Sequence, residues 1–193
     1  KKFEVRTMRS NDKLNLTMLC DFYELTMGNG YFQAGLQDRI TYFDVFFREV
    51  PDKGGFAICA GLDQLIDYIQ DLHFDEEDIE FLRSKRLFSE AFLDYLKNFR
   101  FTGDIWAIPE GTPIFPREPV VTVRAPAIQA QLIETFTLLA VNHQSLIATK
   151  TERIVHAAKG DGVKGKPVTI PIDQDREIVE EVEQKDVSLL GVE

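Results

Sequence analysis

Residues 21–32 read DFYELTMGNGYF, and the N-terminal half of the chain is organised around this stretch. Its apolar and aromatic residues recur at helical spacing, which predicts a short helix that ends near the Gly-Asn-Gly break. On that helix Phe22, Leu25 and Met27 are expected to pack into a core. Residues three and four apart share a helix face, so three polar-tipped residues would line another side: Tyr23, Thr26 and Tyr31.

The composition predicts a soluble protein with a sizeable core. The 193 residues suit one domain, or one and part of another, and 44% of them are hydrophobic. A net charge of −10 argues against nucleic acid as a partner, because such surfaces need clustered Lys and Arg. The charged N-terminus lacks a signal peptide's apolar run, and no segment is long enough to cross a membrane. We therefore expect a cytoplasmic protein with no membrane partner, in which Cys20 and Cys59 are free, buried thiols.

Strand-like segments fall in two regions. Residues 39–48, RITYFDVFFR, are apolar on both alternating faces, which predicts a strand covered on both sides. The Pro-Asp-Lys-Gly-Gly turn that follows predicts a hairpin between this strand and residues 56–60. Three short antiparallel strands are expected within the Pro-punctuated segment 103–126, at residues 105–108, 113–115 and 120–124.

Helical periodicity marks the rest of the chain. Helices are expected at residues 61–71, at 75–86 after an Asp75 cap, and at 89–99 after a Ser89 cap. Residues 127–141 predict another helix, which the polar run 142–145 should interrupt before a further helix at 146–158. Beyond it, the pattern predicts a short strand at 168–172 and an acidic helix at 173–185.

The residues alone identify no catalytic set. His73 is expected to be exposed, His156 to suit the end of a helix dipole, and His143 to be buried and hydrogen-bonded. No nucleotide-binding, hydrolase or metalloprotease motif occurs in the sequence. Lys150 and Arg153 lie three apart on one helical face, where they would form surface ion pairs or meet an anionic ligand. Residue chemistry therefore leads no further than a soluble α+β domain.

Four blocks, in order, carry a resemblance to a known family. They are TMLCDFYELTMGNGYF, FDVFFREVPDKGGFAICAGLDQLI, EGTPIFPREPVVTVRAP and NHQSLIATKTERIVHAA. Together they resemble the N-terminal portion of nicotinate phosphoribosyltransferase, a type II phosphoribosyltransferase, from about residue 16 to about residue 162. The resemblance implies an α+β N-terminal domain beside an α/β barrel. It divides the chain into an arm (1–13), the α+β domain with antiparallel strands (14–126), a helical connector toward the barrel (127–162) and an unmatched acidic tail (163–193).

The resemblance also implies a reaction. Family members join nicotinate to phosphoribosyl pyrophosphate in NAD salvage, forming nicotinate mononucleotide and pyrophosphate, with coupled ATP hydrolysis and Mg²⁺. Tyr23 matches the tyrosine that packs on the nicotinate ring, usually from the neighbouring subunit of a dimer, so we expect a homodimer. Thr149 and Lys150 match positions with a second-tier ligand role.

The barrel segments that hold the family's catalytic histidine and main phosphate ligands are not found in this sequence, so no catalytic or metal-binding residue is assigned. We therefore expect a truncated, spliced or incompletely represented form, inactive in isolation. Two alternatives remain open: a non-catalytic dimerisation or ligand-binding module, and a relative specific for nicotinamide or quinolinate.

Overall fold

The computed structural model describes residues 15–50 and 54–158. Its largest sheet has three antiparallel strands in the order β1-β5-β3. β5 (Val121–Pro126) is central and pairs with β1 (Ile40–Val45) on one side and β3 (Asp104–Ala107) on the other. The hairpin predicted between residues 39–48 and 56–60 is therefore wrong. β1 takes a partner some eighty residues later, while β2 (Ala57–Ile58) pairs with β4 (Pro113–Ile114) in a separate two-stranded sheet.

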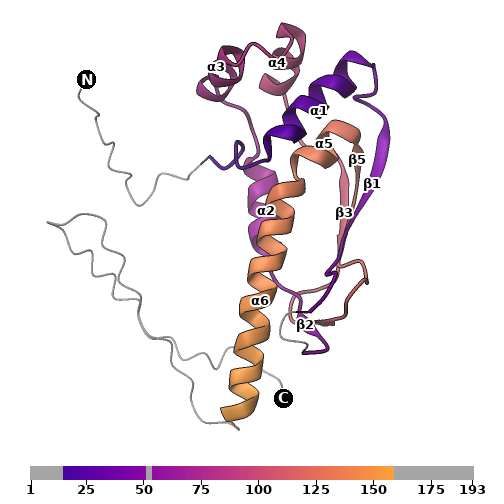
Figure 1. Ribbon diagram of the computed structural model, residues 1–193, viewed down its shortest axis with the longest axis vertical. Helices are drawn as coiled ribbons and strands as arrows, with labels where there is room; N and C mark the ends of the chain where they lie inside the picture. Colours follow the sequence, from indigo (N-terminus) through magenta and orange to yellow (C-terminus); the bar gives the residue numbers. More distant parts are fainter. Residues whose placement is uncertain (1–14, 51–53, 159–193) are drawn as a thin grey trace, which may run out of the picture.

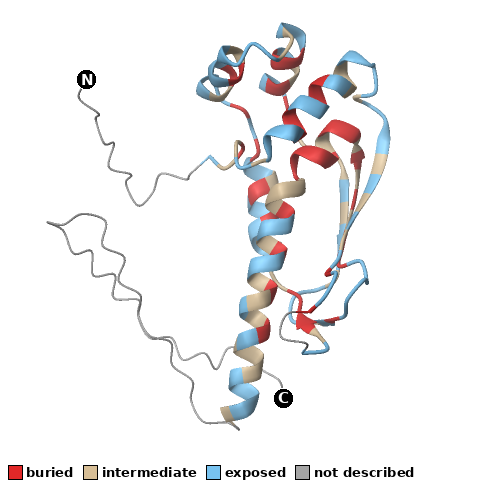
Figure 2. Cartoon of the chain, in the orientation of Figure 1, coloured by how far each residue is buried: buried red, intermediate tan, exposed pale blue. Residues whose placement is uncertain are grey.

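Helices flank these sheets on one side (Figure 1). α1 (Phe22–Gln33) packs on α5 (Ala127–Leu132), which follows β5 directly. α2 (Leu62–Asp71) and the small sheet both pack on the long helix α6 (Glu134–Ala158). α3 (Glu76–Ser84) and α4 (Glu90–Lys97) pack against each other. Buried residues concentrate in α5, α4 and the centre of the sheet, while the far end of α6 is largely exposed (Figure 2).

The predicted N-terminal caps of α3 and α4, Asp75 and Ser89, are confirmed. The Asp75 carboxylate accepts from the Asp78 backbone N–H, and the Asp78 carboxylate accepts from the Asp75 N–H, which forms a capping box. The Ser89 hydroxyl accepts from the Phe92 N–H. Both caps could be predicted from the sequence because each capping residue and the N–H group that it binds are three positions apart.

Three expectations about packing are wrong. Of the three residues expected in the core from α1, only Leu25 is buried, whereas Phe22 and Met27 are 45% and 43% exposed. The buried face of α1 instead carries Glu24, Gly28 and other small or polar residues, since α5 and α4 approach closely there. The strand expected to be covered on both sides, β1, alternates between exposed and half-buried residues, with one face open.

The helix break expected at residues 142–145 is also misplaced. The break falls at residue 133, between α5 and α6, and α6 runs unbroken through the polar run. Asn142 and His143 simply point to solvent, so the expected buried imidazole is exposed, whereas Ser145 is buried and bonds to the backbone of Ala60. Polar residues on an exposed helix face need no interruption. The predicted arm, tail strand and acidic helix lie outside the described residues.

The N-terminus of α2 is fixed by a contact from a distant turn. The Glu110 carboxylate accepts from the backbone N–H groups of Gly61 and Leu62, at 2.6 and 2.7 Å. Gly61 has φ of +107°, and a Cβ there would lie 2.7 Å from the backbone oxygen of Ala140 on α6. Glycine is therefore required at position 61 both by backbone conformation and by the close approach of α6.

We expect Gly61→Ala to lower the free energy of unfolding by roughly 2–4 kcal/mol, because it adds a steric clash to the cost of a left-handed residue. Gly111→Ala is the matched control: Gly111 also has positive φ, but its added Cβ meets nothing within 4 Å. That control should cost about 1 kcal/mol. Urea unfolding of both variants measures the difference. Equal losses of unfolding free energy would contradict the prediction, because they would mean that α6 moves away from the added Cβ at no cost.

Candidate functional site

Tyr23 lies in the first turn of α1 and is 44% exposed. Its hydroxyl donates to Oε1 of Glu134, the first residue of α6, at 3.3 Å. Thr26, one turn on, is exposed on the same side and donates to the Tyr23 carbonyl, whereas Tyr31 is half-buried against the core. Because the hydroxyl is held and the ring is exposed, Tyr23 offers an oriented aromatic surface to a ligand.

A buried polar network anchors this turn. Glu24 has no exposed surface, and its Oε1 accepts from both the hydroxyl (2.6 Å) and the backbone N–H (3.2 Å) of Thr135. The Thr135 hydroxyl in turn accepts from the backbone N–H of Asp21, at 3.2 Å. One threonine of α6 thus holds both the residue before α1 and its buried acid.

Burial raises the pKa of Glu24 from an ordinary 4.5 to about 7. The two hydrogen bonds from Thr135 lower it, while the charges of Glu134 and Asp21 raise it further. The second carboxyl oxygen, Oε2, is buried and has no hydrogen-bond partner among the described residues. With a pKa of about 7, a substantial share of the Glu24 carboxyl groups stays protonated near neutral pH.

Thr149 and Lys150 lie near the other end of α6 and differ in their surroundings. The Thr149 hydroxyl is buried, accepts from the Ile58 N–H at 2.9 Å and donates to the Ser145 carbonyl at 2.5 Å. These bonds give Thr149 a structural task, which is to hold β2 on α6. Lys150 is exposed, and Arg153 is partly buried with its guanidinium directed at the Phe56 carbonyl.

The structure does not bring Tyr23 together with Thr149 and Lys150. Tyr23 is bonded to Glu134, and fifteen residues of continuous helix separate Glu134 from Thr149. At 1.5 Å per residue this is about 22 Å. A single nicotinate-sized ligand therefore cannot contact both ends within one copy of the chain.

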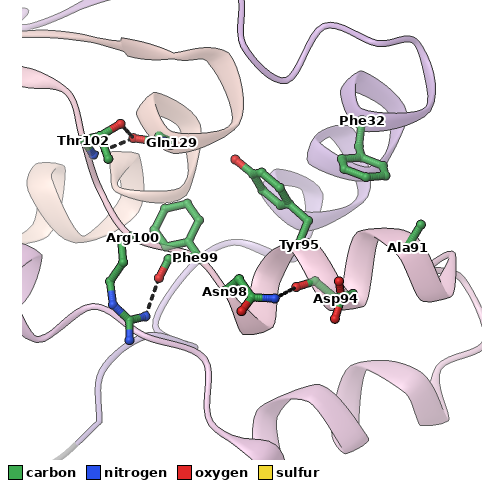
Figure 3. A pocket seen from close by; sticks show the side chains of 9 residues that line it. All are labelled: Phe32, Ala91, Asp94, Tyr95, Asn98, Phe99, Arg100, Thr102 and Gln129. Atoms are coloured by element: carbon green, nitrogen blue, oxygen red, sulfur yellow. Dashed lines mark hydrogen bonds between the residues drawn. The ribbon is translucent and has the colours of Figure 1, made fainter.

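A cavity of about 460 Å³ lies away from these residues, between α1, α4 and α5 (Figure 3). Aromatic rings form part of its wall, with Tyr95 5.5 Å from Phe32 and 6.4 Å from Phe99 between ring centroids. Some of its polar groups bond to each other; for example, the Gln129 side-chain carbonyl accepts from the N–H and hydroxyl of Thr102. None of the site residues predicted from the sequence lines this cavity, and we assign it no ligand.

A second cavity, of about 230 Å³, adjoins Tyr23 through Glu134. It lies between the sheet and the α5–α6 junction, and its walls are mainly apolar. Its charged residues are two acids, Asp44 and Glu134, and its lining contains no Lys or Arg. A ligand carboxylate placed here would need a cation from another part of the protein.

Comparison with known proteins decides the family. The sequence profile of the nicotinate phosphoribosyltransferase (NAPRTase) N-terminal domain matches residues 18–142. The chain belongs to this family. It is 43% identical over 143 residues to nicotinate phosphoribosyltransferase pncB2 of Mycobacterium tuberculosis, covering 74% of this chain and 31% of that protein. To nicotinate phosphoribosyltransferase of Bacillus subtilis it is 38% identical, covering 72% and 29%.

Solved structures agree with that assignment. The crystal structure of human nicotinic acid phosphoribosyltransferase matches with a TM-score of 0.70 and 33% identity, over 75% of this chain and 29% of that one. Nicotinate-nucleotide pyrophosphorylase from Pyrococcus furiosus matches with a TM-score of 0.57 at 19% identity, over 81% and 33%, which shows a shared fold alone. The chain spans a little under a third of the length of the family members it matches.

The described residues add no further reactive set. All three histidines are exposed; His73 follows α2, and His143 and His156 lie thirteen positions apart on α6. Across residues 15–50 and 54–158, no group of three His, Cys, Asp or Glu is placed to hold a metal ion. Cys20 and Cys59 are free thiols, half-buried and buried, close to expectation. No helix of the described part is long and apolar enough to span a membrane.

Sequence reasoning missed Glu24 and Thr135. Neither residue stands out by type, because an acid in the first turn of a helix is ordinarily an exposed partner of the helix dipole. One signal was available: Glu24 lies four residues before Gly28, on the side where the helix carries a small residue instead of a large one. A small residue on that side indicated a close helix contact.

The raised pKa of Glu24 implies that the free energy of unfolding depends on pH. The folded protein holds the proton more tightly than the unfolded chain, so this group's contribution to stability is lost as pH rises from about 4.5 to about 7. Glu24→Gln does not titrate, so its stability relative to wild type should increase across that window by on the order of 2–3 kcal/mol. Urea unfolding at pH 5 and pH 8 measures this difference. Asp67→Asn, which removes an exposed acid of α2, should show no such change, and a pH-independent Glu24→Gln difference would contradict the prediction.

Proposed function

We propose that the protein is a nicotinate phosphoribosyltransferase of NAD salvage. It would join nicotinate to the ribose of phosphoribosyl pyrophosphate and release nicotinate mononucleotide and pyrophosphate, with coupled ATP hydrolysis, in the cytoplasm. The observation that carries this proposal is the exposed, hydrogen-bonded ring of Tyr23 in a chain that belongs to the family. An aromatic ring with a fixed tilt suits a flat pyridine ring, which it can stack against.

The charges around Tyr23 indicate what the rest of the site must supply. The ionisable groups that act electrostatically on Tyr23 are Glu134, Glu24 and Asp21, and all three are acids. Nicotinate carries a carboxylate, which needs Arg, Lys or backbone N–H donors. We therefore propose that Tyr23 contributes the stacking surface, while barrel segments of the partner subunit in a homodimer contribute the cation and the main phosphate-binding groups.

Lys150 and Thr149 would take part at a distance from Tyr23. Lys150 is exposed, so its ammonium group is available to a phosphate of phosphoribosyl pyrophosphate. Thr149 is buried and would act by holding the turn of α6 that presents Lys150. The described residues offer no cluster that fits Mg²⁺, so we assign no residue of this part to Mg²⁺ or ATP and derive no step through them.

The decisive variant is Tyr23→Ala in the protein expressed from its complete reading frame. Loss of a stacking surface should raise the KM for nicotinate at least tenfold, which corresponds to about 1.4 kcal/mol of binding free energy. The KM for phosphoribosyl pyrophosphate should change little. Initial-rate assays of nicotinate mononucleotide formation measure both constants.

Tyr42→Ala provides the control, because Tyr42 is a tyrosine of the sheet that is 66% exposed. This substitution should leave both KM values unchanged. Unaltered nicotinate kinetics in Tyr23→Ala would remove Tyr23 from the site.

Lys150→Ala tests the other end of α6. We expect a several-fold increase in the KM for phosphoribosyl pyrophosphate with no loss of thermal stability, because the side chain is exposed. Lys97→Ala, at an exposed lysine of α4 that pairs with Glu76, is the matched control for removing one positive charge. An unchanged KM in Lys150→Ala would confine this part of α6 to a structural role.

The two alternatives make different predictions. A non-catalytic module would bind ligand or dimerise without turnover, and a nicotinamide- or quinolinate-specific relative would turn over the other substrate. Isothermal titration of the 193-residue chain with nicotinate and with phosphoribosyl pyrophosphate separates the first case. Tight binding of both substrates by this chain would contradict the proposal that other segments supply the phosphate site. Competition among the three pyridine substrates in the turnover assay separates the second case.

A further inference from the structure

The pose of Tyr23 depends on how the first turn of α1 is held. Leu25 gives that turn its buried apolar contact, at 1% exposed, whereas Phe22 is 45% exposed and touches Phe88 edge-on, with ring centroids 5.9 Å apart. Tight packing comes later in the helix, where a Cβ on Gly28 would lie 3.3 Å from the Phe92 ring. The first turn is attached to α6 mainly by polar contacts that converge on one residue, Thr135.

We propose that Glu24 and Thr135 are positioning residues that fix the first turn of α1 on α6 and thereby set the pose of the Tyr23 ring for nicotinate. This inference rests on the proposed function and adds two residues to its site, neither of which touches the ligand. Because Tyr23 precedes Glu24 directly, any tilt of the turn about Glu24 displaces the ring. The Tyr23 hydroxyl bond to Glu134 completes the attachment to the same turn of α6.

The contact also serves a need of α6 itself. Thr135 lies in the first turn of α6, where backbone N–H groups have no partner within the helix. Glu24 accepts from the Thr135 N–H and so caps α6 from a neighbouring helix. The Thr135 hydroxyl returns the contact by accepting from the Asp21 N–H just before α1. Each helix start is thus satisfied by the other, so the two cannot reorient independently.

The protonation state of Glu24 should modulate this attachment. The titratable groups that interact with it are Cys20 and Asp21 before α1, Tyr23, Tyr68 on α2 and Glu134 on α6. Burial, and then neighbouring acids, raise the pKa of the Cys20 thiol; burial also raises that of Tyr68, so both groups stay neutral at physiological pH. Once ionised, Glu24 would place a negative charge on Oε2, which has no donor among the described residues.

Two pairs of variants separate positioning from folding. Glu24→Gln keeps a carbonyl oxygen for both Thr135 donors and mimics the protonated acid, whereas Glu24→Ala removes the acceptor. Thr135→Ser keeps the hydroxyl, whereas Thr135→Val removes it at nearly constant shape. Gln33→Ala, at the exposed end of α1, is the control for a substitution on the same helix.

The first measurement is independent of activity. With 3-fluorotyrosine incorporated at position 23, the ¹⁹F resonance reports the surroundings of the ring in the free protein. Glu24→Ala and Thr135→Val should move or broaden it toward the unfolded position, while Glu24→Gln, Thr135→Ser and Gln33→Ala should keep it near the wild-type position. An unchanged resonance in both disrupting variants would overturn the proposal. If Glu24→Ala does not fold, the two Thr135 variants decide.

The second measurement is kinetic, in the protein from the complete reading frame. Glu24→Ala and Thr135→Val should raise the KM for nicotinate at least fivefold with less than a twofold change in kcat. The ratio of wild-type to Glu24→Gln KM should rise at least threefold from pH 6 to pH 8.5, since substrate ionisation cancels in the ratio. The positioning proposal would be overturned by an equal loss of kcat in all variants, or by a KM ratio that does not change with pH. Absence of nicotinate turnover in wild type would instead overturn the proposed function, and the ¹⁹F measurement would still decide on Glu24 and Thr135.

Discussion

Hydroxyl groups of α6 attach distant parts of the chain to this helix. Those of Ser145 and Thr149 bond to the backbone of residues 58–60, and that of Thr135 bonds to the Glu24 carboxyl group. Ser145 accepts from the Ala60 N–H and donates to its carbonyl, and Thr149 accepts from the Ile58 N–H. Both face the same side as the buried residues Thr137 and Val141, at intervals of four. Small side chains on this side allow residues 58–61 to approach the helix closely, and their hydroxyls replace the hydrogen bonds that the short strand β2 lacks.

That arrangement makes α6 a rigid link between the two ends at which we propose substrate contacts. Its first turn holds the turn of α1 that presents Tyr23, and its last third presents Lys150. About 22 Å of continuous helix keeps these ends apart, so they would serve different parts of a substrate or different copies of a site. A composite site built from two copies satisfies this spacing, because each copy would supply the ring to one ligand and the lysine to another.

The sequence predicted features that depend on neighbouring residues and failed where distant ones decide. The caps at Asp75 and Ser89 follow from residues three positions away, and both were correct. The partner of β1 lies some eighty residues downstream, so the local turn signal predicted the wrong hairpin. Similarly, Phe22 and Met27 have helical spacing, but the direction from which α5 and α4 approach α1 selects the face that is buried. Tyr23 was proposed through family resemblance, whereas the role of Glu24 depends on its contact with Thr135, 111 residues away in sequence.

The presence of a buried acid beneath Tyr23 has a physical rationale. An apolar residue at position 24 would avoid the cost of desolvating a carboxyl group, and it would pack against α6 in many nearly equivalent tilts. A carboxyl group that accepts from two donors of one residue permits one tilt, since hydrogen bonds are directional and hydrophobic contacts are not. Burying Glu24 thus lowers the stability of the fold somewhat, and it fixes the orientation of the first turn of α1. A residue that must present its ring at a fixed angle gains from this arrangement, and a residue that only fills a core does not.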